Sequence, residues 1–255
     1  MNCNITYDGT FKGLLTAIFD CFERKLEPGY IQPKQNKQAE LFGEKLSVTT
    51  DINKADRVLS GLLKRIEKRG LNDLFKVFCS ELPERELLIL RYCRCVFKIG
   101  YNPLKDYRQE SILRVSQIVK KINREIHRTH AFVRFQKTKD DIYAATIKPD
   151  FDVLQLACKH FEDRYQDQHW MIYDTRRDYG IYYDLNETKT IKLEDPQWAG
   201  RHKLRQDHLS EEEKLFEAMW QQYFKATSIV ERKNMKLHLQ HVPYRYWQYL
   251  PEKRV

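Results

Sequence analysis

The sequence lacks the features that mark several specialised classes of protein. Its 255 residues include only 9 glycines and 8 prolines, which excludes collagen-like and low-complexity chains. No stretch approaches the run of about 18 apolar residues that a transmembrane helix needs. The first residues also lack the basic-then-apolar order of a secretory signal. We therefore expect a cytoplasmic protein with no membrane partner.

Motifs of known cofactor chemistry are also missing. We find no glycine-rich phosphate loop, no His-x-Glu motif combined with a cysteine pair, and no Gly-x-Ser-x-Gly turn. Of the six cysteines, Cys93 and Cys95 are only one residue apart, which is not the spacing of zinc or iron–sulfur ligands. We expect buried, reduced thiols, no metal site, and no cofactor in this chain.

Apolar, aromatic and basic residues are plentiful. Hydrophobic residues make up 42% of the chain and aromatic residues 13%, which is enough to fill a core. The formal net charge of +9 is uneven, with +8 in residues 1–128, −4 in residues 129–222 and +5 in residues 223–255. Clustered Lys and Arg favour a polyanionic partner such as nucleic acid, although a solvated helical surface has the same composition.

The first half of the chain has mainly helical periodicity. A short strand ends at Tyr7, and Asp51 is placed to cap a later helix. Gly70 is a candidate helix end, and the polar, proline-containing residues 27–42 indicate a loop. Three segments carry apolar residues at helical spacing, namely residues 11–22, 52–66 and 105–127. The nearly all-apolar run 87–96 is too long for a buried strand and indicates a central helix.

The periodicity changes after residue 128 to that of a small sheet. We expect strands at residues 131–137, 142–147, 170–174, 179–184 and 190–193, with a helix from Asp152 to Arg164 between the second and third. A capping box at Ser210 opens a further helix, and a basic and aromatic arm follows. The predicted fold is α+β: a helical N-terminal half (residues 1–128), then an antiparallel sheet with a helix on one face, a C-terminal helix and the arm (residues 129–255). The two halves form either separate domains or one packed unit.

Asp8, Thr10 and His160 are side chains that suggest chemistry outside the hairpins. Asp8 and Thr10 lie between a strand and a helix, where they either cap the helix or help its amides to hold a phosphate. His160 is a candidate proton donor or phosphate contact, or a partly buried structural histidine. Asp8, His160 and Asp174 are the candidate acid and base residues if the chain is an enzyme.

Basic and aromatic side chains recur on the predicted hairpins and in the C-terminal arm. Arginine grips phosphates and aromatic rings stack on bases, so this pattern is typical of single-strand binding. Ordinary cross-strand pairs, or an arm that docks on its own domain or on a partner, would have the same composition. The candidate nucleic-acid contacts are Arg134, Gln136, Lys137, Arg164, Trp170, Arg176, Arg177, Tyr179, Arg232, Lys233, Arg245, Tyr246 and Trp247.

An ordered set of short motifs resembles one bacterial family. The motifs are Tyr7-Asp8-Gly9-Thr10-Phe11, Arg134-Phe135-Gln136-Lys137, His160-Phe161, Trp170-Met171-Ile172-Tyr173-Asp174, Arg176-Arg177-Asp178-Tyr179-Gly180 and Tyr244-Arg245-Tyr246-Trp247. Together they resemble the DNA metabolism or repair proteins linked to a radical SAM enzyme, whose domain is similar to one fused to uracil-DNA glycosylases. The resemblance implies a DNA context and a radical SAM partner that carries the iron–sulfur cluster.

Three functions remain open at this point. The first is a DNA-binding accessory protein of DNA metabolism or repair that works with the radical SAM partner. The second is an enzyme that acts on damaged or modified DNA or on nucleotides. The third is a protein-interaction scaffold without affinity for DNA.

Overall fold

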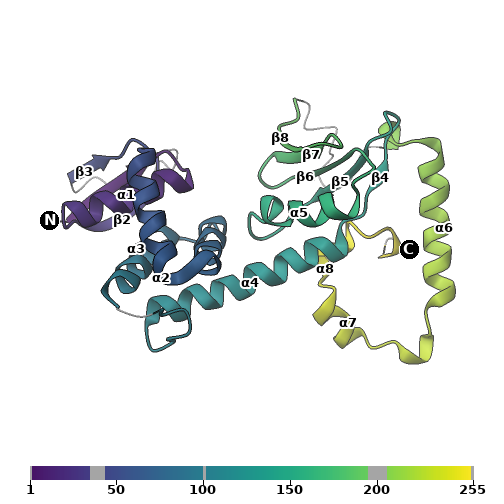
Figure 1. Ribbon diagram of the computed structural model, residues 1–255. Helices are drawn as coiled ribbons and strands as arrows, with labels where there is room; N and C mark the ends of the chain where they lie inside the picture. The colour runs from purple at the N-terminus through teal and green to yellow at the C-terminus, as the bar shows by residue number, and fades with distance from the viewer. Residues whose placement is uncertain (1, 35–43, 100–101, 195–205, 254–255) are drawn as a thin grey trace. The chain divides into compact units, whose positions relative to one another are not determined.

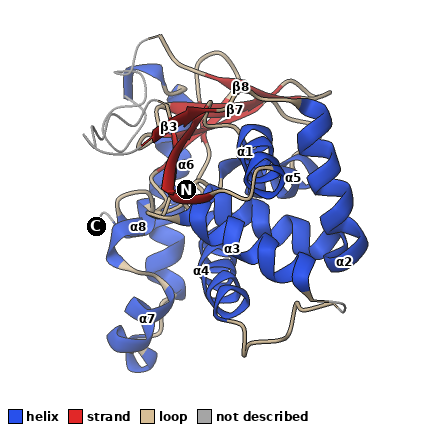
Figure 2. Ribbon diagram, turned by 90° about the vertical axis from the view of Figure 1, so that its left-hand side faces the viewer, coloured by secondary structure: helices blue, strands red, loops and turns tan. Residues whose placement is uncertain are grey.

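The computed structural model describes residues 2–34, 44–99, 102–194 and 206–253, in two compact units. The N-terminal unit comprises Met1–Asn123 and the C-terminal unit Arg124–Val255. The α+β class is confirmed, since helices predominate in the N-terminal unit and the larger sheet lies in the C-terminal unit (Figures 1 and 2).

The N-terminal unit combines helices with a small parallel sheet. Its elements are β1 (Asn2–Tyr7), α1 (Phe11–Glu23), β2 (Glu27–Pro33), β3 (Glu44–Ser47), α2 (Ile52–Cys79), α3 (Arg85–Lys98) and the start of α4 (Glu110–Phe132). The strands run parallel in the order β2-β1-β3. The prediction of a loop over residues 27–42 is therefore wrong where β2 lies. Its two prolines are compatible with a strand because β2 is at the edge of the sheet.

The predicted helix end at Gly70 lies three residues beyond the actual break in α2. Helix α2 runs past it, and the break in its backbone is at Glu67, which has φ 57° and ψ −179°. Gly70 is buried, and a Cβ atom there would lie 2.6 Å from Cβ of Ile66. The glycine therefore allows close packing next to the break. The N-cap at Asp51 is confirmed, since its carboxylate accepts from the amides of Asn53 and Lys54.

The C-terminal unit is built on a five-stranded sheet with the strand order β4-β5-β6-β7-β8. Its strands and first helix are β4 (Gln136–Lys137), β5 (Tyr143–Ile147), α5 (Leu154–Arg164), β6 (Trp170–Asp174), β7 (Tyr179–Tyr183) and β8 (Thr188–Ile191). After them come η1 (Gln206–His208), α6 (Glu211–Thr227), η2 (Val230–Arg232), α7 (Met235–His241), α8 (Tyr244–Trp247) and η3 (Pro251–Lys253).

The sheet is mixed, which corrects the prediction of an antiparallel sheet. Strands β5 and β6 pair in parallel, while the other neighbours are antiparallel. The reason is α5, because a helical crossover between two adjacent strands returns the chain to run in the same direction. The predicted strand over residues 131–137 shrinks to β4, because α4 continues to Phe132.

The core of the C-terminal unit lies between α5 and the sheet. Leu154, Ala157 and Phe161 of α5 pack with Trp170, Ile172 and Ile181 of the strands. A smaller cluster of Ala144, Met171 and Leu209 packs separately from it. All six cysteines are free thiols, four of them buried. Within the described ranges, no helix has both the length and the apolar character required to cross a bilayer.

Candidate functional site

The loop after β1 is held together by the carboxylate of Asp8. This carboxylate accepts hydrogen bonds from the Thr10 amide (2.9 Å), the Thr10 hydroxyl (2.8 Å) and the Thr50 hydroxyl (2.6 Å). Thr10 in turn caps α1 by accepting from the Gly13 amide at 2.9 Å. Desolvation raises the pKa of Asp8, but the bonds from Thr50 and Thr10 outweigh it and leave that pKa below its ordinary value.

The same loop leaves little room for an outside anion. A Cβ atom at Gly13 would lie only 2.1 Å from Oδ1 of Asp8, so the carboxylate sits directly against the first turn of α1. A helix N-terminus attracts negative charge, and here the protein supplies that charge itself. Of the two interpretations for Asp8 and Thr10, the geometry favours the cap.

The hairpin between β6 and β7 is organised around a fully buried carboxylate, that of Asp174. It accepts from the Arg176 amide (2.9 Å), the Arg177 amide (3.3 Å) and Nη1 of Arg177 (2.7 Å). Nη1 of Arg177 also donates to the carbonyl of Pro149, and Nη1 of Arg176 to that of Asp150. These side chains therefore tie the hairpin turn to the loop after β5. Only Arg176 of the three is exposed.

Tyr179 and Arg164 have partners within the same unit. The hydroxyl of Tyr179 donates to Asp152, and burial followed by this carboxylate raises the pKa of Tyr179. The guanidinium of Arg164 lies over the ring of Tyr165, 5.7 Å from its centroid. Asp152, expected at the start of α5, thus binds a tyrosine, while Val153 is the N-cap residue.

The C-terminal arm docks on its own unit. Arg245 forms ion pairs with Glu125 and Asp150, and Tyr246 packs against Phe132 with ring centroids 4.9 Å apart. The indole of Trp247 donates to the carbonyl of Val242 at 2.9 Å. Arg232 and Lys233, which follow α6, are exposed.

His160 stacks on a second histidine. The rings of His130, on α4, and His160, on α5, have centroids 4.0 Å apart and an interplanar angle of 19°. Burial, followed by the charges of His160 and His127, lowers the pKa of His130 to about 4. In the part of the chain that the structure describes, no group of three or more His, Cys, Asp or Glu side chains is arranged to hold a metal ion.

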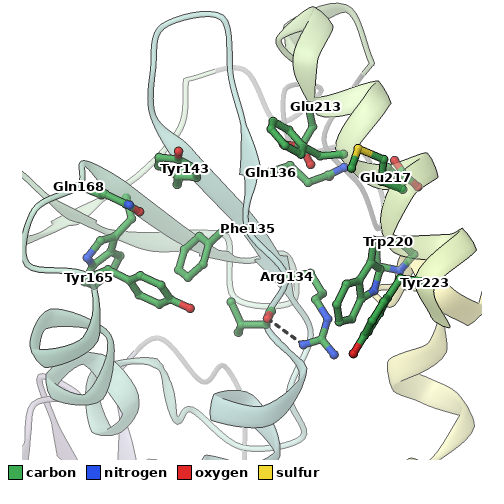
Figure 3. A pocket seen from close by; sticks show the side chains of 15 residues that line it. Arg134, Phe135, Gln136, Tyr143, Tyr165, Gln168, Glu213, Glu217, Trp220 and Tyr223 are labelled. Carbon is green, nitrogen blue, oxygen red and sulfur yellow. Dashed lines mark hydrogen bonds between the residues drawn. The ribbon is translucent and has the colours of Figure 1, made fainter. Parts of the chain in front are cut away.

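A cleft of about 920 Å³ lies in the C-terminal unit and is here called the aromatic cleft. Figure 3 shows Phe135, Tyr143 and Tyr165 on one wall, and Trp220 and Tyr223 of α6 on the other. Arg134, Gln136 and Trp170 of the predicted contacts belong to its lining. The full lining is Val133, Arg134, Phe135, Gln136, Tyr143, Tyr165, Gln168, Trp170, Glu213, Phe216, Glu217, Met219, Trp220, Tyr223 and Pro251.

Two polar bridges hold α6 in place. Near its start, the carboxylate of Glu213 accepts from the backbone amide of Lys137 at 3.0 Å. Further along, the indole of Trp220 donates to Oε2 of Glu252 (2.9 Å), and Oε1 of Glu252 accepts from Arg134 (3.0 Å). The side chain of Glu252 is only 6% exposed, so this carboxylate is an internal part of the frame.

Helix α6 nevertheless buries none of its side chains. Phe216 is 56% exposed and Tyr223 60%, although both are apolar rings that line the cleft. On the opposite wall, Trp170 is fully buried, and its Nε1 has no hydrogen-bond partner among the described residues. The cleft therefore combines uncovered rings on α6 with a buried indole on the opposite wall whose N–H lacks a partner among the described residues.

The wall of the cleft formed by α6 is not among the predicted contacts. Phe216, Met219, Trp220 and Tyr223 have the spacing of one helical face, and such a stripe is ordinarily the buried side of a helix. The signal was present in the sequence, but periodicity alone does not distinguish a buried stripe from one that faces a cleft.

Comparison with known proteins identifies a family of unknown function. The domain of unknown function DUF4130 matches residues 83–252. Every residue that lines the aromatic cleft falls in this range, whereas Asp8 does not. No curated protein is similar enough in sequence to match the chain.

Proposed function

The chain belongs to the DUF4130 domain family, and we propose that its aromatic cleft binds an unstacked base of single-stranded or damaged DNA. One observation carries the proposal: seven of the fifteen lining residues are aromatic, around a volume of about 920 Å³. Stacking a base on an aromatic side chain contributes about 1–3 kcal/mol. The aromatic residues are Phe135, Tyr143, Tyr165, Trp170, Phe216, Trp220 and Tyr223.

The proposed role is that of an accessory protein in DNA metabolism or repair. Asp8, His160 and Asp174 are not among the residues that line the cleft. Asp174 accepts three hydrogen bonds within its own hairpin, and Asp8 is engaged by the first turn of α1. Exposed Arg232 and Lys233, which follow α6 in the chain, are suited to phosphate contacts. We propose that the radical SAM partner, which the family resemblance implies, carries out the chemistry.

DNA binding across a salt series tests the cleft. We expect the full chain to bind a single-stranded oligonucleotide more tightly than a duplex, with affinity that falls as salt rises, because phosphate contacts release counterions. Phe216→Ala removes one stacking surface and should weaken single-strand binding by about tenfold. Leu215→Ala is the matched control. Leu215 immediately precedes Phe216 on α6, is 62% exposed and does not line the cleft.

If Phe216→Ala and Leu215→Ala changed the affinity for single-stranded DNA equally, the cleft would not be part of the DNA-binding surface. Salt-independent binding, or none at all, would contradict the proposal of a DNA-binding protein. Co-purification with the radical SAM iron–sulfur protein tests the second part. If the partner is captured and no DNA affinity is found, the chain is an interaction scaffold instead.

A further inference from the structure

The aromatic cleft has an acidic side. Glu213 and Glu217 are four residues apart on α6, so their carboxylates lie on one face of the helix, and both line the cleft (Figure 3). Burial raises the pKa of Glu213, the Lys137 amide lowers it, and the nearby charge of Glu217 raises it again; the net shift is upward. The negative charge of Glu213 is thus disfavoured in the empty cleft, and a bound cation would relieve it.

The positive charge in the lining is already matched. Arg134 is the one Lys or Arg residue among the fifteen that line the cleft. Its guanidinium donates to Oε1 of Glu252 at 3.0 Å and to the carbonyls of Ala131 and Val133 at 2.8 and 3.2 Å. The lining thus holds two carboxylates, those of Glu213 and Glu217, against the one guanidinium of Arg134, which is engaged with Glu252.

The aromatic walls favour the same kind of ligand. The face of an aromatic ring carries negative charge density and attracts cations, Trp most strongly. Trp220 and Tyr223 stand together on α6 with ring centroids 5.8 Å apart and an interplanar angle of 28°, and both are exposed at the cleft. A flat cation can stack on such rings while its N–H groups donate to carboxylates.

From these charges and rings we infer that the cleft prefers a positively charged base, an N-alkylated purine or pyrimidine, over its neutral parent. The inference rests on the proposed function and names the class of base that the cleft selects. Stacking holds either kind of base, and the carboxylates of Glu213 and Glu217 supply the preference for the cation.

A pair of isomeric bases provides the test. One single-stranded oligonucleotide carries 1-methyladenine, which is cationic at neutral pH, and the other carries N6-methyladenine, which has the same methyl group and is neutral. With the full chain at neutral pH and one fixed salt concentration, we expect the cationic oligonucleotide to bind about tenfold more tightly. Phosphate contacts are common to both oligonucleotides and cancel in the ratio of dissociation constants.

Charge-neutralising variants locate the preference. Glu213→Gln combined with Glu217→Gln should reduce the ratio of the two dissociation constants to about one. Glu212→Gln is the control, because it removes the same charge from the first turn of α6, where the carboxyl side chain is 71% exposed and does not line the cleft. Its ratio should stay at about ten.

The other outcomes overturn the preference for a cation, its assignment to Glu213 and Glu217, or the proposed function. Equal affinity for the two oligonucleotides overturns the preference for a cation and leaves base binding in place. A ratio that survives in the double variant places the selectivity outside Glu213 and Glu217 and overturns the inference. Failure to bind either oligonucleotide overturns the proposed function as well.

Discussion

The loop after β1 and the aromatic cleft both contain polar side chains. They differ in whether the protein itself supplies the hydrogen-bond partners of those side chains. In the loop, every bond described for the Asp8 carboxylate comes from the protein, and Gly13 is needed to make room for it. In the cleft, the buried indole N–H of Trp170 has no partner among the residues that the structure describes, and the rings of α6 that line the cleft are exposed. A motif that suggests chemistry in the sequence can thus be self-satisfied, while a binding surface is recognised by what its own fold leaves unsatisfied.

Breaking the bridge from Arg134 and Trp220 to Glu252 should have the largest effect on stability. Glu252→Ala leaves Arg134 and the indole of Trp220 without their shared acceptor. Breaking a fully buried ion pair costs about 3–5 kcal/mol, and Arg134 is 31% exposed, so we expect a loss of about 2 kcal/mol. Urea unfolding followed by tryptophan fluorescence measures it, because all four tryptophans lie in the C-terminal unit.

The control for this variant is Glu231→Ala, which removes an exposed carboxylate. A loss below about 0.5 kcal/mol in Glu252→Ala would show that α6 does not depend on this bridge.

The self-satisfied loop should show strong coupling between two residues. Gly13→Ala places a methyl group against Oδ1 of Asp8, and we expect overpacking to lower the free energy of unfolding by about 1–2 kcal/mol. In an Asp8→Ala background the contact with the carboxylate is gone and only Oγ1 of Thr50, 2.9 Å from the added Cβ, stays close, so the same substitution should cost less, since Ala is the better helix former. Hydrogen exchange of the α1 amides in the four proteins gives the coupling. Simple additivity would show that the carboxylate does not occupy the helix N-terminus.

The histidine pair should give a smaller, pH-dependent effect. The pKa of His130 is lowered to about 4, so the unfolded chain takes up a proton below about pH 6.5 while the folded chain does not. Stability from this group is present above about pH 6.5 and is lost as the pH falls towards 4, by about 1 kcal/mol after allowance for partial exposure.

His130→Phe keeps a ring against His160 and should flatten the stability profile between pH 6.5 and 4. His241→Phe, which changes an exposed histidine, is the comparison. If the slope is unchanged in His130→Phe, another group is responsible for it.

The smallest effect on stability is expected on the exposed face of α6. Leu215→Lys and Met219→Lys alter side chains that are 62% and 56% exposed, so each should change the free energy of unfolding by less than about 0.5 kcal/mol. The same tryptophan fluorescence assay applies. A loss of more than about 1 kcal/mol in Met219→Lys, whose side chain lines the cleft, would mean that this side chain is packed against the protein and that the cleft is closed.

Local signals in the sequence predicted much of the C-terminal unit. Strand Trp170–Asp174 was predicted to the residue, and the hairpin that follows was placed within one residue of its end. Strand β2 was missed because it is an edge strand with two prolines, and its partner β1 is brought alongside by a helical crossover. Long-range pairing of this kind leaves no trace in local periodicity.

The cleft was only partly predictable for a related reason. Arg134, Gln136 and Trp170 were found from their residue types in a strand pattern. Their neighbours on α6 come from 43 to 89 residues further along the chain, and the bridge through Glu252 that holds them there depends on the folded structure. Which pairs of segments face each other is set by tertiary packing.

Because α6 buries none of its side chains, its cleft-facing residues bear on the history of the family as well. Selection for folding acts weakly on positions whose substitution costs almost no stability, so drift should replace large apolar residues there. In descendants of a common ancestor, positions 216 and 223 would then keep their aromatic rings only where a ligand requires them. Aromatic residues retained at these two positions would therefore indicate how long the binding activity has been maintained, rather than how old the fold is.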